Sequence, residues 1–166
     1  MTNDKTALVV RLSHEDIEVA EKLKALHDAA YAVEARLLGL DEFPPLNRAL
    51  ESYANSTSAF FGYMRNGDCV GSVEIEALDF SGIEVASLVV DPRFSRQGIA
   101  TKLMIHVLNK AGSGRIVVST AEANVPAIKL YEGLGFEKVD QWTTEDGLEI
   151  VQLAKSAGNL GAESER

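Results

Sequence analysis

The chain has 166 residues, of which 46% are hydrophobic and 25% charged, a composition that suits one soluble domain with a hydrophobic core. Its 25 acidic and 16 basic residues give a formal charge of −9, which disfavours a nucleic-acid partner. The single cysteine, Cys69, excludes an intramolecular disulfide, and no apolar run has the length of a signal peptide or a membrane span. We therefore expect a cytoplasmic protein with no membrane partner.

The first third of the chain predicts a strand and two helices. Ala7–Leu12 is an apolar run typical of a strand. A long helix is expected from Ile17, because apolar residues recur there at helical spacing, and Gly39 is its expected end. Leu46–Tyr53 is expected to form a second, shorter helix.

A hairpin comes next, because the Asn66-Gly67 dipeptide separates two strand-like runs, Ala59–Arg65 and Val70–Leu78. The remaining elements are expected to be a strand at Ile83–Val90, a helix at Gly98–Ala111, a strand at Arg115–Thr120, a helix at Val125–Leu134, and strands at Glu137–Thr143 and Leu148–Ala154. This order predicts an α+β fold with a mixed sheet rather than repeated βαβ units. We expect a single domain over residues 1–155 and a disordered tail at Ser156–Arg166.

The junction between the Ile83–Val90 strand and the following helix, DPRFSRQGIATKLM, has the features of an anion site. The first N–H groups of a helix have no partner within the helix, and they bind anions where side chains leave room. Gly98 and Ala100 leave that room, and Arg93 and Arg96 add positive charge. The alternative is an ordinary surface loop before a helix.

A second segment, AEANVPAIKLYEGLGFEKV, strengthens the ligand-binding interpretation. Asn124 stands where its helix begins, Pro126 lies in the first turn, and Gly135 lies close to the end. The two segments together resemble the two signatures of the GNAT superfamily of N-acetyltransferases. The first of these signatures is Gln/Arg-x-x-Gly-x-Gly/Ala, and it follows a strand. The signatures cover about a third of the chain. One position departs from the pattern, because Ser95 stands where the signature has Gln or Arg.

The resemblance implies a central, mostly antiparallel seven-stranded sheet, flanked by helices and splayed between the fourth and fifth strands. It also implies acetyl-CoA as cosubstrate and no metal, which agrees with the absence of any Cys/His metal-site spacing. By similarity, the residues expected to bind the cofactor are Leu88, Val89, Val90, Arg96, Gln97, Gly98, Ile99, Ala100, Thr101, Asn124 and Tyr131. Asn124 also has an alternative role as a simple helix cap.

The same resemblance implies the catalytic roles. An amine attacks a thioester only as the free base, and a tyrosine phenol, with a pKa near 10, can protonate the departing thiolate. Tyr131 is the expected acid, with an aromatic packing role as its alternative. Glu84 is the favoured base, because it shares strand parity with Leu88 and Val90. An exposed strand-end glutamate is its alternative, and the rival bases are Glu74, Glu76 and Glu122.

The acceptor is expected to be a primary amine, in the first place that of a small molecule. The alternative is a protein N-terminus, because the second signature also resembles that of ribosomal-protein acetyltransferases. A noncatalytic acyl-CoA-binding module is the alternative from another class. Similar proteins are commonly homodimers, although nothing in the composition indicates one. By similarity, the acceptor pocket would be built from Tyr31, Glu34, Arg36, Asp41, Glu42, Tyr53 and the region Gln141–Asp146. Its acidic residues suit a cationic amine or, alternatively, form a solvated helix end.

Overall fold

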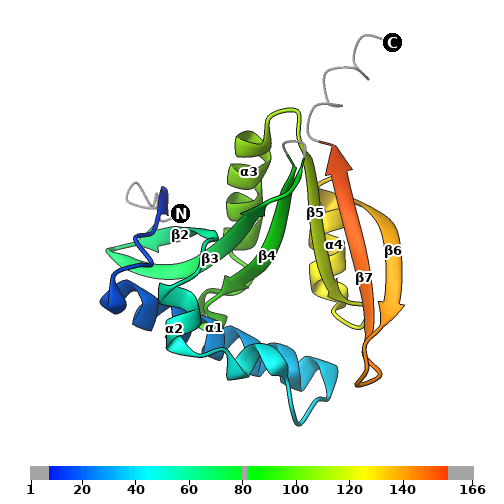
Figure 1. Cartoon of the computed structure of the whole chain (residues 1–166), viewed down its shortest axis with the longest axis horizontal. Coiled ribbons are helices and arrows are strands. Elements are labelled where there is room, and N and C mark those ends of the chain that lie inside the picture. Colours follow the sequence, from blue (N-terminus) through cyan, green and yellow to red (C-terminus); the bar gives the residue numbers. More distant parts are fainter. Residues whose placement is uncertain (1–7, 80–81, 157–166) are drawn as a thin grey trace. The chain divides into compact units, whose positions relative to one another are not determined.

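The computed structural model describes residues 8–79 and 82–156. The strands form a seven-stranded sheet in the order β1-β2-β3-β4-β5-β7-β6 (Figure 1). The strands are β1 Leu8–Arg11, β2 Ala59–Arg65, β3 Asp68–Ala77, β4 Ile83–Val90, β5 Arg115–Ala121, β6 Glu137–Thr143 and β7 Glu149–Ser156. The expected mixed sheet is confirmed, since β4 pairs parallel with β5 while the β1–β2, β2–β3, β5–β7 and β6–β7 pairs are antiparallel.

The helices are α1 Ile17–Leu38, α2 Leu50–Ala54, α3 Ile99–Ala111 and α4 Val125–Gly133, with short 3-10 turns η1 Pro44–Asn47 and η3 Pro92–Phe94. The chain divides into two compact units. One contains the residues up to Ile75 together with Ser87–His106, and the other contains Glu76–Ala86 together with the residues from Val107 onwards.

In the first unit, the strands β2 and β3 carry helices on both faces. On one face, Phe60 of β2 packs in a buried cluster with Ala20 and Leu23 of α1 and Tyr53 of α2. On the other face, the ring of Phe61 lies 4.8 Å from that of His106 in α3. Adjacent β2 residues thus point to opposite layers, as the two-residue period of a strand requires.

In the second unit, β7 lies between β5 and β6, and its core residues Val151 and Leu153 are buried. The end of α4 is tied to this sheet, because Lys155 of β7 donates a hydrogen bond to the carbonyl of Leu134 at 2.8 Å. Every residue of β6 is exposed. The buried residues of β5 and β7 therefore contribute to the core of this unit, whereas β6 does not.

Most element boundaries agree with the sequence predictions, but the second helix does not. Leu46–Tyr53 is not one helix, because η1 ends at Asn47, Arg48 and Ala49 are extended, and α2 begins only at Leu50. Ser156 ends β7, and the rest of the predicted tail lies outside the described residues. Within the described part of the chain, no helix combines the length and apolar character needed to cross a membrane.

Candidate functional site

The loop before α3 leaves its backbone open. Ser95, Arg96, Gln97 and Gly98 are all exposed, and α3 begins at Ile99. Arg96 has φ 61° and Gly98 has φ 77°, so two residues of this short loop adopt left-handed conformations. A left-handed arginine is costly, and such residues concentrate at ligand sites. The loop has the open backbone that an anion site needs.

The side chains before the loop are already engaged with one another. Asp91 accepts hydrogen bonds from the backbone and the guanidinium of Arg93, the latter at 2.8 Å. The hydrogen bonds from Arg93 lower the pKa of Asp91 below its usual value. Ser95 donates its hydroxyl to the carbonyl of Pro92 at 3.0 Å. Arg93 is thus held by Asp91 at the start of the junction.

The predicted pantetheine-pairing segment, Leu88–Val90, is the last part of β4. Val89 is buried, and its two neighbours are half-buried. Among the described residues, β4 pairs with β5 only over Ile83–Val85, opposite Ile116–Val118. Leu88–Val90 therefore lies outside the described β4–β5 ladder.

Asn124 and Tyr131 both belong to α4, in the second unit. The side chain of Asn124 accepts a hydrogen bond from the N–H of Ala127 at 3.3 Å, so Asn124 does cap this helix. Tyr131 is 5% exposed, and its ring centre lies 5.8 Å from that of Phe136. The structure thus contains both the helix cap expected as the alternative for Asn124 and the aromatic packing expected as the alternative for Tyr131. Neither contact prevents these residues from also contacting a ligand.

The glutamates proposed as bases have different surroundings. Glu84 is half-buried in β4, and burial alternates along this strand as its predicted parity requires. Glu76 and Glu122 are exposed. Glu74 is buried and accepts hydrogen bonds from Arg48 at 2.8 and 3.1 Å and from Ser87 at 3.0 Å. Because both of its oxygens already accept hydrogen bonds, Glu74 is poorly placed to act as the general base.

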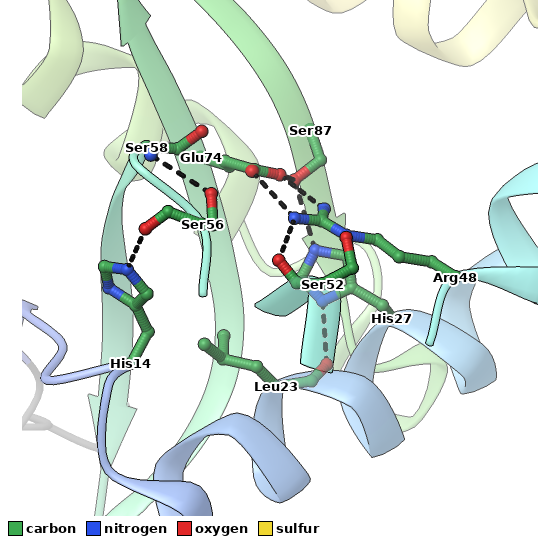
Figure 2. A network of polar contacts seen from close by, with 9 residues as sticks. All are labelled: His14, Leu23, His27, Arg48, Ser52, Ser56, Ser58, Glu74 and Ser87. Atoms are coloured by element: carbon green, nitrogen blue, oxygen red, sulfur yellow. Dashed lines mark hydrogen bonds and ion pairs between the residues drawn. The ribbon is translucent and has the colours of Figure 1, made fainter. Parts of the chain in front are cut away.

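Glu74 is the centre of a buried polar network between α1, α2, β3 and β4 (Figure 2). Arg48 binds it with two guanidinium nitrogens and also donates to Ser52. Ser87 donates its one hydroxyl proton to Glu74, and the Nε2 of His27 lies 3.1 Å from the same hydroxyl oxygen. Since a carbonyl oxygen only accepts, His27 donates its Nδ1 proton to the carbonyl of Leu23 at 2.8 Å. A neutral imidazole that carries its proton on Nδ1 has no proton on Nε2 to give to Ser87.

The charge states follow from this packing. Burial opposes ionisation of Glu74, but the hydrogen bonds and charge of Arg48 outweigh it and hold the carboxyl pKa below its usual value. Burial lowers the pKa of His27 from 6.5 to about 4. Burial also raises the pKa of Tyr53 to about 12 and that of Tyr31 further still. At pH 7 the network is one ion pair surrounded by neutral groups.

The buried neutral histidine predicts a loss of stability in acid. Since the pKa of His27 is lower in the folded chain than in the unfolded chain, its contribution is intact above pH 6.5 and declines as the pH falls towards 4. Over this window it should reduce the free energy of unfolding by about 3 kcal/mol. Urea unfolding of the wild type between pH 7.5 and 4 measures this decline.

The matched variant is His27→Gln, which does not titrate in this window. Carboxylates titrate in both proteins, so the difference between the two stability curves isolates His27. We expect a shallower curve for the variant between pH 6.5 and 4. Parallel curves would show that His27 is not held neutral by its surroundings.

Two of the predicted acceptor residues, Tyr31 and Tyr53, pack against the same residue of the first unit. The rings of Tyr31 and Tyr53 pack against His27, with centres 5.7 and 5.0 Å away. Asp41 and Glu42 are exposed, as the solvated-helix-end alternative expects. The region Gln141–Asp146 belongs to the second unit. Among the described residues, no group of His, Cys, Asp and Glu side chains could hold a metal ion.

Sequence reasoning missed the network around Glu74 and one arginine at the α3 loop. Arg65, the last residue of β2, donates a hydrogen bond to the side-chain oxygen of Gln97 at 2.6 Å. Nothing in the sequence around Arg65 distinguishes it from an ordinary strand-end cation.

Two curated proteins are similar over most of this chain. The UPF0157 protein YqkA of Bacillus subtilis is 31% identical over 138 residues, which are 82% of this chain and 40% of that protein. The chain therefore spans two fifths of that relative's length. The N-alpha-acetyltransferase RimI of Mycobacterium tuberculosis is 29% identical over 131 residues, which are 75% of this chain and 81% of that protein.

Solved structures share the fold. The ribosomal-protein-S18-alanine N-acetyltransferase of Escherichia coli matches with a TM-score of 0.73 and 19% identity, over 92% of this chain and 94% of that one. The PaiA N-acetyltransferase of Thermoplasma acidophilum, in complex with coenzyme A, matches with a TM-score of 0.66 and 18% identity, over 89% of this chain and 98% of that one. These likenesses confirm the predicted fold class.

The family model described as "Acetyltransferase (GNAT) family" matches residues 21–136, which are more than half of the chain and include the first signature segment and the second as far as Phe136. The chain belongs to the acetyltransferase (GNAT) family.

Proposed function

We propose that the protein is an acetyl-CoA-dependent N-acetyltransferase that transfers the acetyl group to a primary amine. The observation that carries this proposal is the α3 loop, whose exposed backbone bends through left-handed Arg96 and Gly98 into a helix N-terminus. Such a backbone suits the pyrophosphate of a nucleotide cofactor. The family match and the coenzyme A complex of a structural neighbour support this assignment.

Cofactor binding would use the parts of the chain that the family resemblance indicates. The N–H groups of residues 96–101 would hold the pyrophosphate, and the backbone of Leu88–Val90 would pair with the pantetheine amides. The short β4–β5 ladder supports the second role, because Leu88–Val90 lies outside it and β5 does not use the backbone groups of this segment in the described part of the chain. Asn124 would add a contact from the start of α4.

The chemistry removes two protons from the acceptor nitrogen and delivers one to the sulfur. The ammonium group loses its first proton, the free amine forms the new C–N bond, and the C–S bond of the thioester breaks. The nitrogen then loses its second proton to solvent as the neutral amide forms, and solvent returns a proton to the acid that protonated the thiolate. Glu84 would take the first proton, directly or through water, and Tyr131 would give its phenolic proton to the thiolate. Tyr131 suits this role because its nearly buried phenol lies in a helix of the family's second signature.

We propose a small-molecule amine as the acceptor and the α-amino group of a protein N-terminus as the second candidate. The second candidate is favoured by the relative named N-alpha-acetyltransferase, which matches this chain over 81% of its own length. Either acceptor presents the same reacting group, an uncharged primary amine.

Calorimetric titration with acetyl-CoA tests the cofactor assignment first, and micromolar affinity is the expected result. A free-thiol assay would then compare a panel of small amines with peptides bearing free N-termini, and mass spectrometry would locate the acetyl group. Turnover with peptides alone would select the second candidate. Binding without turnover on either panel would instead favour a noncatalytic acyl-CoA-binding module.

The Tyr131→Phe variant tests the proposed acid. It keeps the ring against Phe136 and removes only the hydroxyl, so acetyl-CoA affinity should be nearly unchanged. Turnover should fall about 10-fold or more, within the usual range of general acid catalysis. Steady-state rates with the best acceptor, combined with calorimetry, separate the two effects. Equal turnover in both proteins would remove Tyr131 from the mechanism.

A further inference from the structure

The loop before α3 lacks the side chain that its signature provides. Ser95 stands at the position of Gln or Arg, and its hydroxyl is used to close the η3 turn through the carbonyl of Pro92. Ser95 is therefore uncharged and already engaged. If the loop holds phosphates through its N–H groups and the exposed Arg96, a cation from another part of the chain would add to the charge that meets them.

Arg65 reaches this loop from β2. Its guanidinium donates to the side-chain oxygen of Gln97 at 2.6 Å, across 32 residues of sequence. The guanidinium carbon lies 5.5 Å from the centre of the Phe94 ring and 5.8 Å from that of Tyr63, distances typical of cation–π contacts. Two aromatic rings and Gln97 thus fix a half-buried arginine beside the loop.

A second cation follows on α3. Lys102 lies in the first turns of that helix, and its ammonium donates to the Tyr63 hydroxyl at 3.3 Å. Tyr63 is therefore within cation–π distance of two cationic side chains, Arg65 and Lys102. In a chain with a formal charge of −9, two cations fixed beside one exposed loop give that loop a local preference for anions.

We propose that Arg65 is a further phosphate-binding residue, which holds Gln97 in place and supplies the charge that Ser95 lacks. This inference rests on the proposed function, since the phosphates are those of acetyl-CoA. A guanidinium is suited to the role because it keeps its charge at all relevant pH values and can hold an amide oxygen and a phosphate oxygen with separate N–H groups.

The test compares two ligands that differ in their phosphates. Acetyl-CoA carries the pyrophosphate and the ribose phosphate, whereas S-acetylpantetheine carries no phosphate. Both are titrated calorimetrically into the wild type, Arg65→Ala, Arg65→Lys and Arg11→Ala. Arg11 is an exposed arginine of β1 that pairs with Phe61, and its removal changes the net charge equally without touching the loop.

We expect Arg65→Ala to weaken acetyl-CoA binding about 10-fold or more and to leave S-acetylpantetheine binding unchanged. Arg65→Lys should recover part of the affinity for acetyl-CoA, because lysine keeps the positive charge. The recovery should be incomplete, because lysine lacks the paired N–H donors of a guanidinium. Arg11→Ala should bind both ligands like the wild type. A selective loss of phosphate-dependent affinity is a result that a purely structural role would not produce.

Two results would overturn the inference. An unchanged affinity of Arg65→Ala for acetyl-CoA would show that the arginine does not act on the ligand. An equal loss for both ligands would show that the variant disturbs the fold or the whole cleft. A wild-type protein that binds neither ligand would instead contradict the proposed function itself, so the two failures are distinguishable.

Discussion

Replacing Gly98 with Glu is expected to weaken acetyl-CoA binding about 100-fold. A carboxylate about 5 Å from a phosphate, at an effective dielectric constant near 20, costs about 3 kcal/mol, which corresponds to that factor. The new side chain would not disturb the unliganded loop by collision, because a Cβ at this position meets no atom within 4 Å. Calorimetric titration of the variant with acetyl-CoA measures the effect.

The matched control is Gly98→Ala. Gly98 has φ 77°, so any side chain here costs about 1–2 kcal/mol of backbone strain. Alanine brings that strain without the charge, and it should weaken acetyl-CoA binding much less than glutamate does. Thermal melts of both variants check that the fold is kept. If Gly98→Glu bound acetyl-CoA as tightly as the wild type, the loop would be an ordinary surface connection.

Local signals explain why the hairpin could be predicted from sequence. The Asn66-Gly67 turn has φ of 52° and 83° at its two residues, which few other residue pairs tolerate. The pairing of Arg65 with Asp68 closes this turn as a two-residue loop. The turn residues themselves specify the conformation, so no information from distant residues is needed.

The second helix was predicted wrongly because a distant contact determines its backbone. The apolar spacing of Leu46–Tyr53 favours a helix, but Arg48 is extended, with φ −65° and ψ 122°. From this conformation Arg48 reaches Glu74, 26 residues along the chain. Periodicity within an eight-residue window carries no information about such a partner.

The residues of the candidate site differ in the same way, because some are contiguous in sequence and others meet only in the folded chain. The α3 loop could be found because its glycine, its arginines and the following helix are contiguous in sequence. The network could not, because His27 and Ser87 are 60 residues apart and each is an unremarkable residue in its own segment. Arg65 is a similar case, since only the folded hairpin brings it to Gln97. Contiguous sites are readable from sequence, and sites assembled by tertiary packing are not.

Arg48→Ala is expected to destabilise the protein by about 3–5 kcal/mol, because it leaves a buried carboxylate without its countercharge. The side chain of Glu74 is 4% exposed and that of Arg48 is 23% exposed, so water cannot replace the lost partner easily. The guanidinium also covers the ring of Tyr53 at 4.1 Å. Urea unfolding at pH 7 measures the change in free energy.

The chain offers a matched control in Lys24 and Asp28. This pair has the same 2.8 Å distance between charged atoms as Arg48 and Glu74, but its side chains are 31% and 39% exposed. Lys24→Ala should therefore cost only about 0–1 kcal/mol, since solvent screens the charge that remains. Because the distances are equal, the difference between the losses of unfolding free energy in the two variants measures the effect of burial on the remaining carboxylate. Equal losses from Arg48→Ala and Lys24→Ala would show that the Glu74 carboxylate is accessible to water in solution.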